Sequence, residues 1–276
     1  MMYNTIMQIG VSTATYFTRK YTEEALVPIA KLGAKVCEIF FATHSEYTEE
    51  FANIVNKELI KAQEFSPLKV HSVHALTNQF EPELFSLNDR SYNDAMNTFK
   101  KVCRVAEIVG AKNYTFHGAT MLKKTTYNFN YPHISERVNI LCETARQYGV
   151  QFCYENVHWA YFCTPEYFDK LKDICPDLGC VLDIKQAMQS GIPYEEYLKV
   201  MKGRLKTVHL CDFNEDRKLA IPGRGTFDFI TLFKRLLDSG FDGPCMMELY
   251  AKDYKDDKDL QESYDYLLDC FDRALN

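Results

Sequence analysis

The stretch Tyr148-Gly149-Val150-Gln151-Phe152-Cys153-Tyr154-Glu155-Asn156 joins a glycine to a short apolar run that ends in a carboxylate and an amide. Glycine at the end of a helical segment supplies its left-handed stop, and a short apolar run that follows is typical of a buried strand. The same junction recurs at three other places: Leu32-Gly33-Ala34, Val109-Gly110-Ala111 and Ser239-Gly240-Phe241. The pattern predicts helices that lead directly into buried strands.

Short apolar runs of this kind recur along the whole chain. They are Met7 to Ser12, Val36 to Phe41, Val70 to Ala75, Asn113 to Gly118, Val150 to Asn156, Cys180 to Ile184, Thr207 to Cys211 and Pro244 to Tyr250. The segments between them are long enough for helices, and Ser91 to Val109 has helical periodicity. Alternating strands and helices predict parallel pairing with crossover helices. No GxGxxG loop follows the first run, which disfavours an open doubly wound sheet, so we expect an α/β fold, a closed (β/α)8 TIM barrel.

Composition limits the classes of protein that fit. The chain has 276 residues, 46% of them hydrophobic, and a formal net charge of −6. We therefore expect one domain over residues 1–276 and no nucleic-acid partner. Met1 to Thr5 is not a basic segment before a long apolar run, and no run is long enough to span a membrane. Ten cysteines without a CxxC pair are typical of free thiols, so we expect a cytoplasmic protein that is not membrane-bound.

Polar side chains stand at the carboxyl ends of six of the predicted strands. They are His74, His117, Glu155, Asp183, His209 and Glu248. Active sites of barrels of this kind lie at that end of the strands. Because side chains alternate along a strand, we expect these six to point into the barrel mouth, and His71 to face the helices instead.

Three carboxylates and an imidazole on one axis would repel one another without a cation. We therefore expect Glu155, Asp183, His209 and Glu248 to bind one divalent metal ion. This ligand set suits Mn²⁺, Mg²⁺ or Co²⁺ and also fits Zn²⁺.

The motifs in the second half of the chain resemble the xylose-isomerase-like barrel superfamily. They are Tyr154-Glu155-Asn156, Leu182-Asp183, Val208-His209-Leu210-Cys211-Asp212, Ile221-Pro222-Gly223-Arg224-Gly225-Thr226-Phe227-Asp228-Phe229 and Gly240-Phe241-Asp242-Gly243-Pro244 with Glu248. The resemblance covers nearly the whole chain and is strongest from Val150 to Tyr250.

This resemblance implies a sugar or sugar-phosphate isomerase or epimerase in which Glu155 and Glu248 also act as the acid/base pair. A metal that chelates a carbonyl and a neighbouring hydroxyl favours proton abstraction through an enediolate. Two alternatives stay open: a metal-dependent lyase or dehydratase of a sugar, cyclitol or keto acid, and an endonuclease IV-like AP endonuclease. Similar proteins also imply a homodimer or homotetramer.

The resemblance further implies the residues that contact substrate. His74 and His117 stand where the endonuclease IV branch holds additional zinc ions and sugar isomerases hold substrate, and we expect substrate contact here. The aspartate-x-x-histidine of the family reads Asp183-Ile184-Lys185-Gln186, and its aspartate-x-histidine reads Arg217-Lys218-Leu219. Gln186 is a poor zinc ligand but can donate to a sugar hydroxyl, which argues against a trinuclear nuclease.

Two further residues are expected at the substrate. His158 follows the fifth predicted strand and could form part of a pocket wall. Arg217 could hold a phosphate or hydroxyl group, since arginine suits anions.

Overall fold

The computed structural model describes residues 7–76, 79–120, 129–161 and 163–276. Met1 to Thr5, which argued against an export signal, lie outside the described residues. The barrel strands are β1 (Ile9–Ser12), β2 (Val36–Phe41), β3 (Lys69–Ala75), β4 (Asn113–Phe116), β5 (Gln151–Glu155), β6 (Gly179–Asp183), β7 (Leu205–Leu210) and β10 (Cys245–Met247). Each falls on one of the predicted apolar runs.

The strands close into a barrel in the order β1-β10-β7-β6-β5-β4-β3-β2, and β2 pairs with β1. Every pair in the barrel is parallel. The predicted closed (β/α)8 barrel is therefore confirmed. Because all the strands run the same way, their carboxyl ends meet at one mouth.

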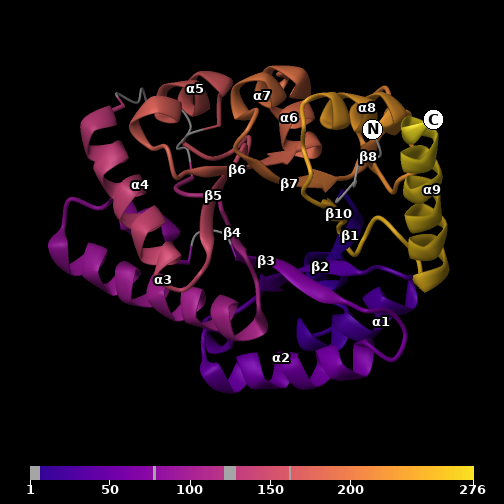
Figure 1. Cartoon of the computed structure of the whole chain (residues 1–276), viewed down its shortest axis with the longest axis horizontal. Coiled ribbons are helices and arrows are strands. Elements are labelled where there is room, and N and C mark those ends of the chain that lie inside the picture. The colour runs from indigo at the N-terminus through magenta and orange to yellow at the C-terminus, as the bar shows by residue number, and fades with distance from the viewer. Residues whose placement is uncertain (1–6, 77–78, 121–128, 162) are drawn as a thin grey trace.

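Helices surround the barrel, as Figure 1 shows. They are α1 (Leu26–Lys31), α2 (Glu49–Ala62), α3 (Asp89–Val109), α4 (Tyr131–Arg146), α5 (Pro165–Ile174), α6 (Ile184–Ser190), α7 (Tyr194–Met201), α8 (Phe229–Asp238) and α9 (Asp257–Leu275). Gly110 ends α3 with a left-handed φ of 81°, and its N–H bonds back to the last turn, which confirms the predicted stop.

Side chains that point away from the barrel axis pack against these helices. Phe116, Tyr154, Leu182 and Val208 are completely buried in the hydrophobic core. This layer fixes the strands, so the side chains that alternate with it are held toward the axis.

A short hairpin follows β7 at its carboxyl end. Its strands, β8 (Asp212–Phe213) and β9 (Leu219–Ala220), pair antiparallel. Arg217 lies in the exposed turn between them with a positive φ of 61°.

The prediction that His71 faces the helices is wrong. Its Nε2 lies 3.0 Å from Oγ1 of Thr207, on a strand across the barrel from β3. The register of β2 and β3 shifts between Cys37 and Glu38, so that Glu38 pairs with Ser72 and His71 is the extra residue of a bulge. A bulge interrupts the regular alternation of side chains, and His71 therefore turns inward.

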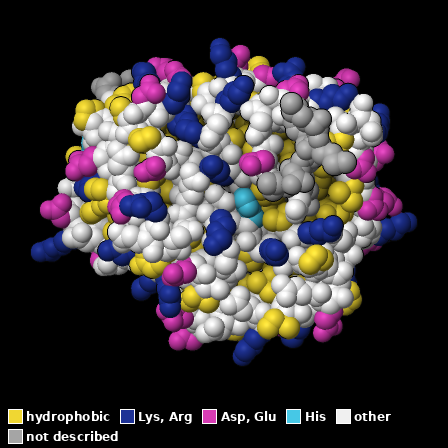
Figure 2. Space-filling model, viewed as in Figure 1, with side chains coloured by type: hydrophobic (Ala, Val, Ile, Leu, Met, Phe, Trp, Pro, Cys, Tyr) yellow, Lys and Arg dark blue, Asp and Glu magenta, His cyan; other side chains and the backbone are white. Residues whose placement is uncertain are grey.

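None of the helices in the described ranges is long and apolar enough to cross a membrane. All ten cysteines are free thiols, as expected. On the face drawn in Figure 2, Lys and Arg side chains are interspersed with Asp and Glu side chains.

Candidate metal centre

The six polar residues predicted at the strand ends are all buried. His74, Glu155, Asp183 and His209 lie on β3, β5, β6 and β7, while His117 and Glu248 directly follow β4 and β10. None of the six is more than 8% exposed. The strand order therefore brings six ionisable side chains into one small volume that is largely shielded from water.

Three sets, drawn from these six side chains and the buried Glu38, could each hold a metal ion, because the ligand atoms within each set lie within 4.8 Å of one another. The sets are Glu155 with Asp183 and His209, Glu38 with His209 and Glu248, and His74 with His117 and Glu155.

His209 is the centre of the predicted four-residue ligand set. Its Nδ1 lies 3.7 Å from Oε1 of Glu155 and 3.8 Å from Oε2 of Glu248. Asp183 joins Glu155 and His209 in one set, whereas Glu248 joins His209 in another. The three carboxylates thus lie around one imidazole, although no single set contains all four residues.

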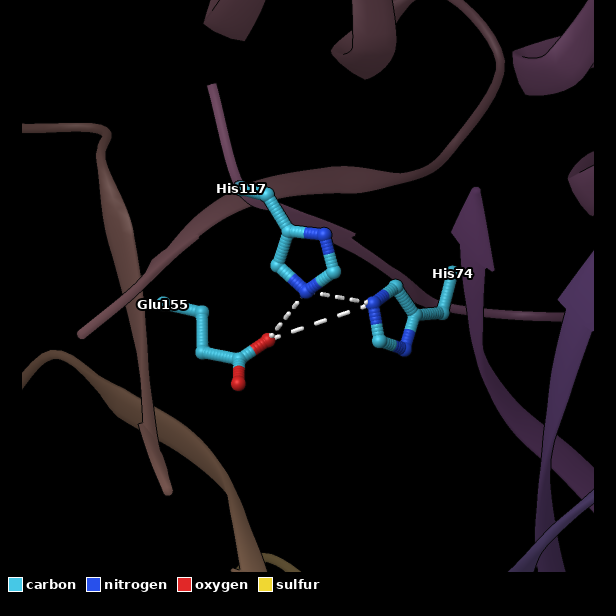
Figure 3. Close-up of side chains that lie close together, drawn as sticks. All are labelled: His74, His117 and Glu155. Carbon is cyan, nitrogen blue, oxygen red and sulfur yellow. Dashed lines mark hydrogen bonds and ion pairs between the residues drawn. The ribbon is translucent and has the colours of Figure 1, made fainter. Parts of the chain in front are cut away.

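His74 on β3 and His117 directly after β4 both approach Glu155, as Figure 3 shows. The Nε2 atoms of the two histidines are 2.7 Å apart, and Nε2 of His117 lies 3.0 Å from Oε2 of Glu155. Two imidazole nitrogens this close need a proton or a cation between them. The pair can therefore bind a substrate hydroxyl or take part in binding an ion.

Glu38, on β2, is a member of the site that the sequence analysis missed. It is completely buried, and its Oε1 lies 3.1 Å from Nε2 of His209 and 3.4 Å from Nδ1 of His74. Its sequence signal was a single charged residue inside the apolar run Val36 to Phe41. Buried carboxylates are rare without a partner, so that residue was a candidate.

Lys185 is the second residue that was missed. It lies in the first turn of α6, is 4% exposed, and places its Nζ 3.2 Å from Oε2 of Glu248 and 3.5 Å from Oδ2 of Asp183. The ammonium also lies over the ring of Tyr250, 4.9 Å from its centre. A fixed positive charge therefore adjoins two of the expected metal ligands.

The carboxylates of the site differ in their affinity for protons. Burial raises the pKa of Asp183; Lys185 opposes this shift, but Glu155 and Glu248 add to it, and the pKa reaches about 6. Burial alone would raise the pKa of Glu248, but His209 and Lys185 outweigh it and lower the pKa to about 2. Glu248 is thus ionised at neutral pH in the metal-free protein.

The histidines are shifted in the opposite direction. Burial alone would lower the pKa of His74, but the carboxylates of Glu248 and Glu38 outweigh it and raise the pKa to about 10. The same two carboxylates overcome burial at His209 and hold its pKa well above the usual value. Protons on these imidazoles balance the carboxylate charge when no metal is bound.

Several buried ligand atoms have no hydrogen-bond partner. They are Oε1 of Glu38, Oε2 of Glu155, Oδ2 of Asp183, Nδ1 of His74 and both ring nitrogens of His209, which have charged neighbours within 4.0 Å but no hydrogen bond. Buried polar atoms are costly to leave unpaired, and these converge on one volume. Oxygen and imidazole donors in this combination fit a divalent metal ion.

Two of the predicted substrate contacts lie beside this cluster. Oε1 of Gln186 accepts from the backbone N–H of His158 at 3.1 Å and lies 2.5 Å from Nδ1 of the same residue. The backbone N–H of Gln186 donates to Asp183, whose carboxylate caps α6. The loop after β5 is thereby tied to the ligand set.

Arg217 is not brought to the cluster. Its exposed side chain lines a separate surface cavity of about 430 Å³, bordered by the ends of α6 and α7 and by the β8–β9 hairpin. A role for Arg217 at the substrate therefore stays a prediction.

Part of the chain is similar in sequence to a known enzyme. An inosose dehydratase of Clostridium perfringens is 27% identical over 135 residues, which are 42% of this chain and 46% of that enzyme. The match thus spans less than half of the relative.

Solved structures match over nearly the whole chain. A D-psicose 3-epimerase from Clostridium cellulolyticum H10, crystallised with D-tagatose, has a TM-score of 0.73 at 16% identity and covers 96% of this chain and 99% of its own. A 3-keto-D-glucoside 4-epimerase from E. coli has a TM-score of 0.76 at 16% identity, over 96% of this chain and 100% of its own. The IolI protein, whose structure has a bound zinc atom, has a TM-score of 0.78 at 19% identity, over 97% of this chain and 99% of its own. At these identities the likeness establishes the fold.

The family model of the xylose isomerase-like TIM barrel matches residues 26–270. The chain belongs to this family.

Proposed function

We propose that this protein is a sugar or sugar-phosphate isomerase or epimerase that depends on one divalent metal ion. The observation that carries the proposal is the placement of Glu155 and Glu248, which approach the same imidazole of His209 from strands that lie on either side of β7 in the barrel. Such a pair can remove a proton from a substrate carbon and return one from another direction. The epimerases among the structural neighbours support this reaction class.

Glu155 and Glu248 are both ionised at neutral pH in the metal-free protein. Burial would raise the pKa of Glu155, but His117 and His209 outweigh it and hold the pKa well below its usual range. Either carboxylate can therefore accept the proton, and the one that has accepted it becomes the acid. Return to the opposite face of the same carbon gives an epimer, and delivery to the adjacent carbon gives an isomer.

Glu155, Asp183, His209 and Glu248 would hold the metal ion. When bound, Mn²⁺, Mg²⁺, Co²⁺ or Zn²⁺ at these ligands supplies positive charge for the oxygen of the enediolate. His74 and His117 would donate to substrate hydroxyls beside Glu155, and Gln186 and His158 would border the same space.

The test is exchange of substrate hydrogen with solvent. Metal-loaded protein in D₂O is incubated with a panel of free and phosphorylated ketoses, and deuterium incorporation is followed by NMR. We expect exchange for at least one ketose, and a loss of about 10²-fold or more in Glu155→Gln and Glu248→Gln, the usual contribution of a general acid or base. Absence of exchange from every ketose by protein of confirmed metal content would refute the proposal.

A dehydratase is the second candidate, because the chain has 27% sequence identity over 135 residues to an inosose dehydratase. Proton abstraction next to a carbonyl also begins the loss of water from a cyclitol ketone. Release of an unsaturated product absorbing in the ultraviolet, rather than a rearranged sugar, would favour this candidate.

A further inference from the structure

Glu38 is a completely buried carboxylate at the base of the proposed metal centre. Burying an ionised carboxylate costs several kcal/mol unless its oxygens are well satisfied. Neither the ligand set nor the acid/base pair of the proposed function includes Glu38. Its presence in the middle of a barrel strand therefore needs another explanation.

The two oxygens of Glu38 face different partners. Oε2 accepts hydrogen bonds from the hydroxyls of Ser72, at 2.7 Å, and Thr115, at 2.9 Å. These bonds come from β3 and β4 and fix the rotation of the carboxylate. Oε1 is left to face the imidazoles of His209 and His74, at 3.1 Å and 3.4 Å.

The contacts of each imidazole are divided between its two nitrogens. In His209, Nε2 faces Glu38, whereas Nδ1 faces Glu155 and Glu248. In His74, Nδ1 faces Glu38 and also Oε1 of Glu248, at 3.6 Å, while Nε2 faces His117 and also Oε2 of Glu155, at 4.0 Å. A neutral imidazole has one N–H donor and one acceptor nitrogen, and a carboxylate accepts only.

We propose that Glu38 is a positioning residue that holds the N–H of His209 on Nε2, so that Nδ1 is the nitrogen offered to a metal ion. The same oxygen holds the N–H of His74 on Nδ1 and leaves Nε2 to face His117 and the substrate. A carboxylate behind a ligating histidine fixes its tautomer and raises its basicity. One residue on β2 thus sets the donor atoms of two histidines on β3 and β7.

The inference rests on the proposed metal centre but not on the nature of the substrate. Protein that binds Zn²⁺ through Nδ1 of His209 and exchanges no ketose hydrogen would keep the inference and refute the proposed reaction. The two proposals can therefore fail separately.

The experiment uses Zn²⁺-loaded full-length protein labelled with ¹⁵N-histidine. Two-dimensional NMR reports which ring nitrogen carries the proton and which binds the ion, and spectra of His74→Asn and His209→Asn assign the signals. We expect His209 to carry its proton on Nε2 and to bind Zn²⁺ through Nδ1, and His74 to carry its proton on Nδ1. Calorimetry on Glu38→Gln should show Zn²⁺ affinity lowered by about 10- to 100-fold, the usual effect of losing such a partner.

Glu46→Gln is the matched control. Glu46 is also buried, 8% exposed, and accepts from Thr22 and from the backbone N–H of Thr43, outside the metal centre. Its substitution should leave Zn²⁺ affinity unchanged. Ser72→Ala is a milder change that removes one hydrogen bond to Glu38 but keeps its carboxylate and the bond from Thr115. This variant should preserve both histidine tautomers, and it can be examined even if Glu38→Gln does not fold.

Three results would overturn the inference: Zn²⁺ on Nε2 of His209, affinity of a folded Glu38→Gln variant within twofold of wild type, or no Zn²⁺ binding at all. An equal loss of affinity in Glu46→Gln would also overturn it, because the effect would then come from general destabilisation.

Discussion

Lys185 and Asp183 are two positions apart in the chain, and the ammonium of Lys185 meets the carboxylates of Asp183 and Glu248 in the metal-free site. A positive charge this close to two ligands competes with a divalent cation for the same oxygens. We therefore expect Lys185 to neutralise the carboxylates when the metal is absent and to weaken the binding of the metal.

Removal of this charge should tighten metal binding. Lys185→Met keeps most of the side-chain volume, and we expect its affinity for Mn²⁺ or Zn²⁺ to rise about tenfold, or about 1.4 kcal/mol. Lys252→Met is the control, since Lys252 lies over the same ring of Tyr250 but is exposed. Calorimetric titration measures both; unchanged or weaker binding in Lys185→Met would show that the ammonium does not compete.

Metal affinity should also depend on pH. Glu38 and Glu248 outweigh burial and hold the pKa of His209 well above the usual value, so that this residue is protonated at neutral pH without metal. A metal needs the neutral imidazole and must displace that proton, so affinity should rise with pH by about tenfold per unit for each proton released. Titrations with Zn²⁺ from about pH 6 to about pH 8 check this, and affinity that is constant across the range would contradict it.

At the level of single residues, the sequence predicted the site residues at the strand ends but not Glu38 and Lys185, which contact them. The ends of the apolar runs can be located in the sequence, and Glu155, Asp183 and His209 were chosen because they stand there. Glu38 lies in the middle of β2, and Lys185 lies on a helix, so neither stood at an expected position. Their roles depend on contacts between strands and helices that are remote along the chain.

At the level of secondary-structure elements, the conformation of the loop after the β8–β9 hairpin depends on the carboxylate of Asp212. Oδ1 of Asp212 accepts from the N–H groups of Phe213 and Phe227, at 2.8 and 3.1 Å, and Oδ2 accepts from those of Gly223 and Gly225, at 3.1 and 3.0 Å. These bonds fold the glycine-containing segment back onto β8. These contacts join two of the motifs of the sequence, the one that ends at Asp212 and the one from Ile221 to Phe229.

Asp212→Asn should destabilise this loop. The amide nitrogen of asparagine would face two N–H donors that lose their acceptor, and we expect the free energy of unfolding to fall by about 1–3 kcal/mol. Urea denaturation measures the change, with Asp216→Asn in the exposed hairpin turn as the control. A loss within about 0.5 kcal/mol, the usual range for surface substitutions, would contradict the role given to Asp212.

The elements also show where a simple pattern fails. Phe116 and Tyr154, which precede or alternate with residues of the mouth, lie in the core as regular alternation requires, yet alternation misplaced His71. The cause is the bulge in the pairing of β2 with β3, which the spacing of apolar residues does not reveal.

For the whole molecule, the barrel was predictable because eight apolar runs and the helices between them repeat along the chain. Glycines such as Gly110 and Gly149, both with left-handed φ, mark the junctions between these units. The substrate was not predictable, because it depends on loops whose side chains follow no repeat. Arg217 illustrates this, since its loop directs it to a cavity apart from the cluster.

The central claim is that the buried cluster at the mouth is a centre for one divalent metal ion. Metal content per chain, measured by mass spectrometry on purified protein and on Glu248→Gln, tests it most directly. We predict one ion per chain in the wild type and weakened retention in the variant. Protein that binds no ion even after incubation with Mn²⁺, Mg²⁺, Co²⁺ or Zn²⁺ would contradict the account, and three zinc ions per chain would indicate a nuclease instead.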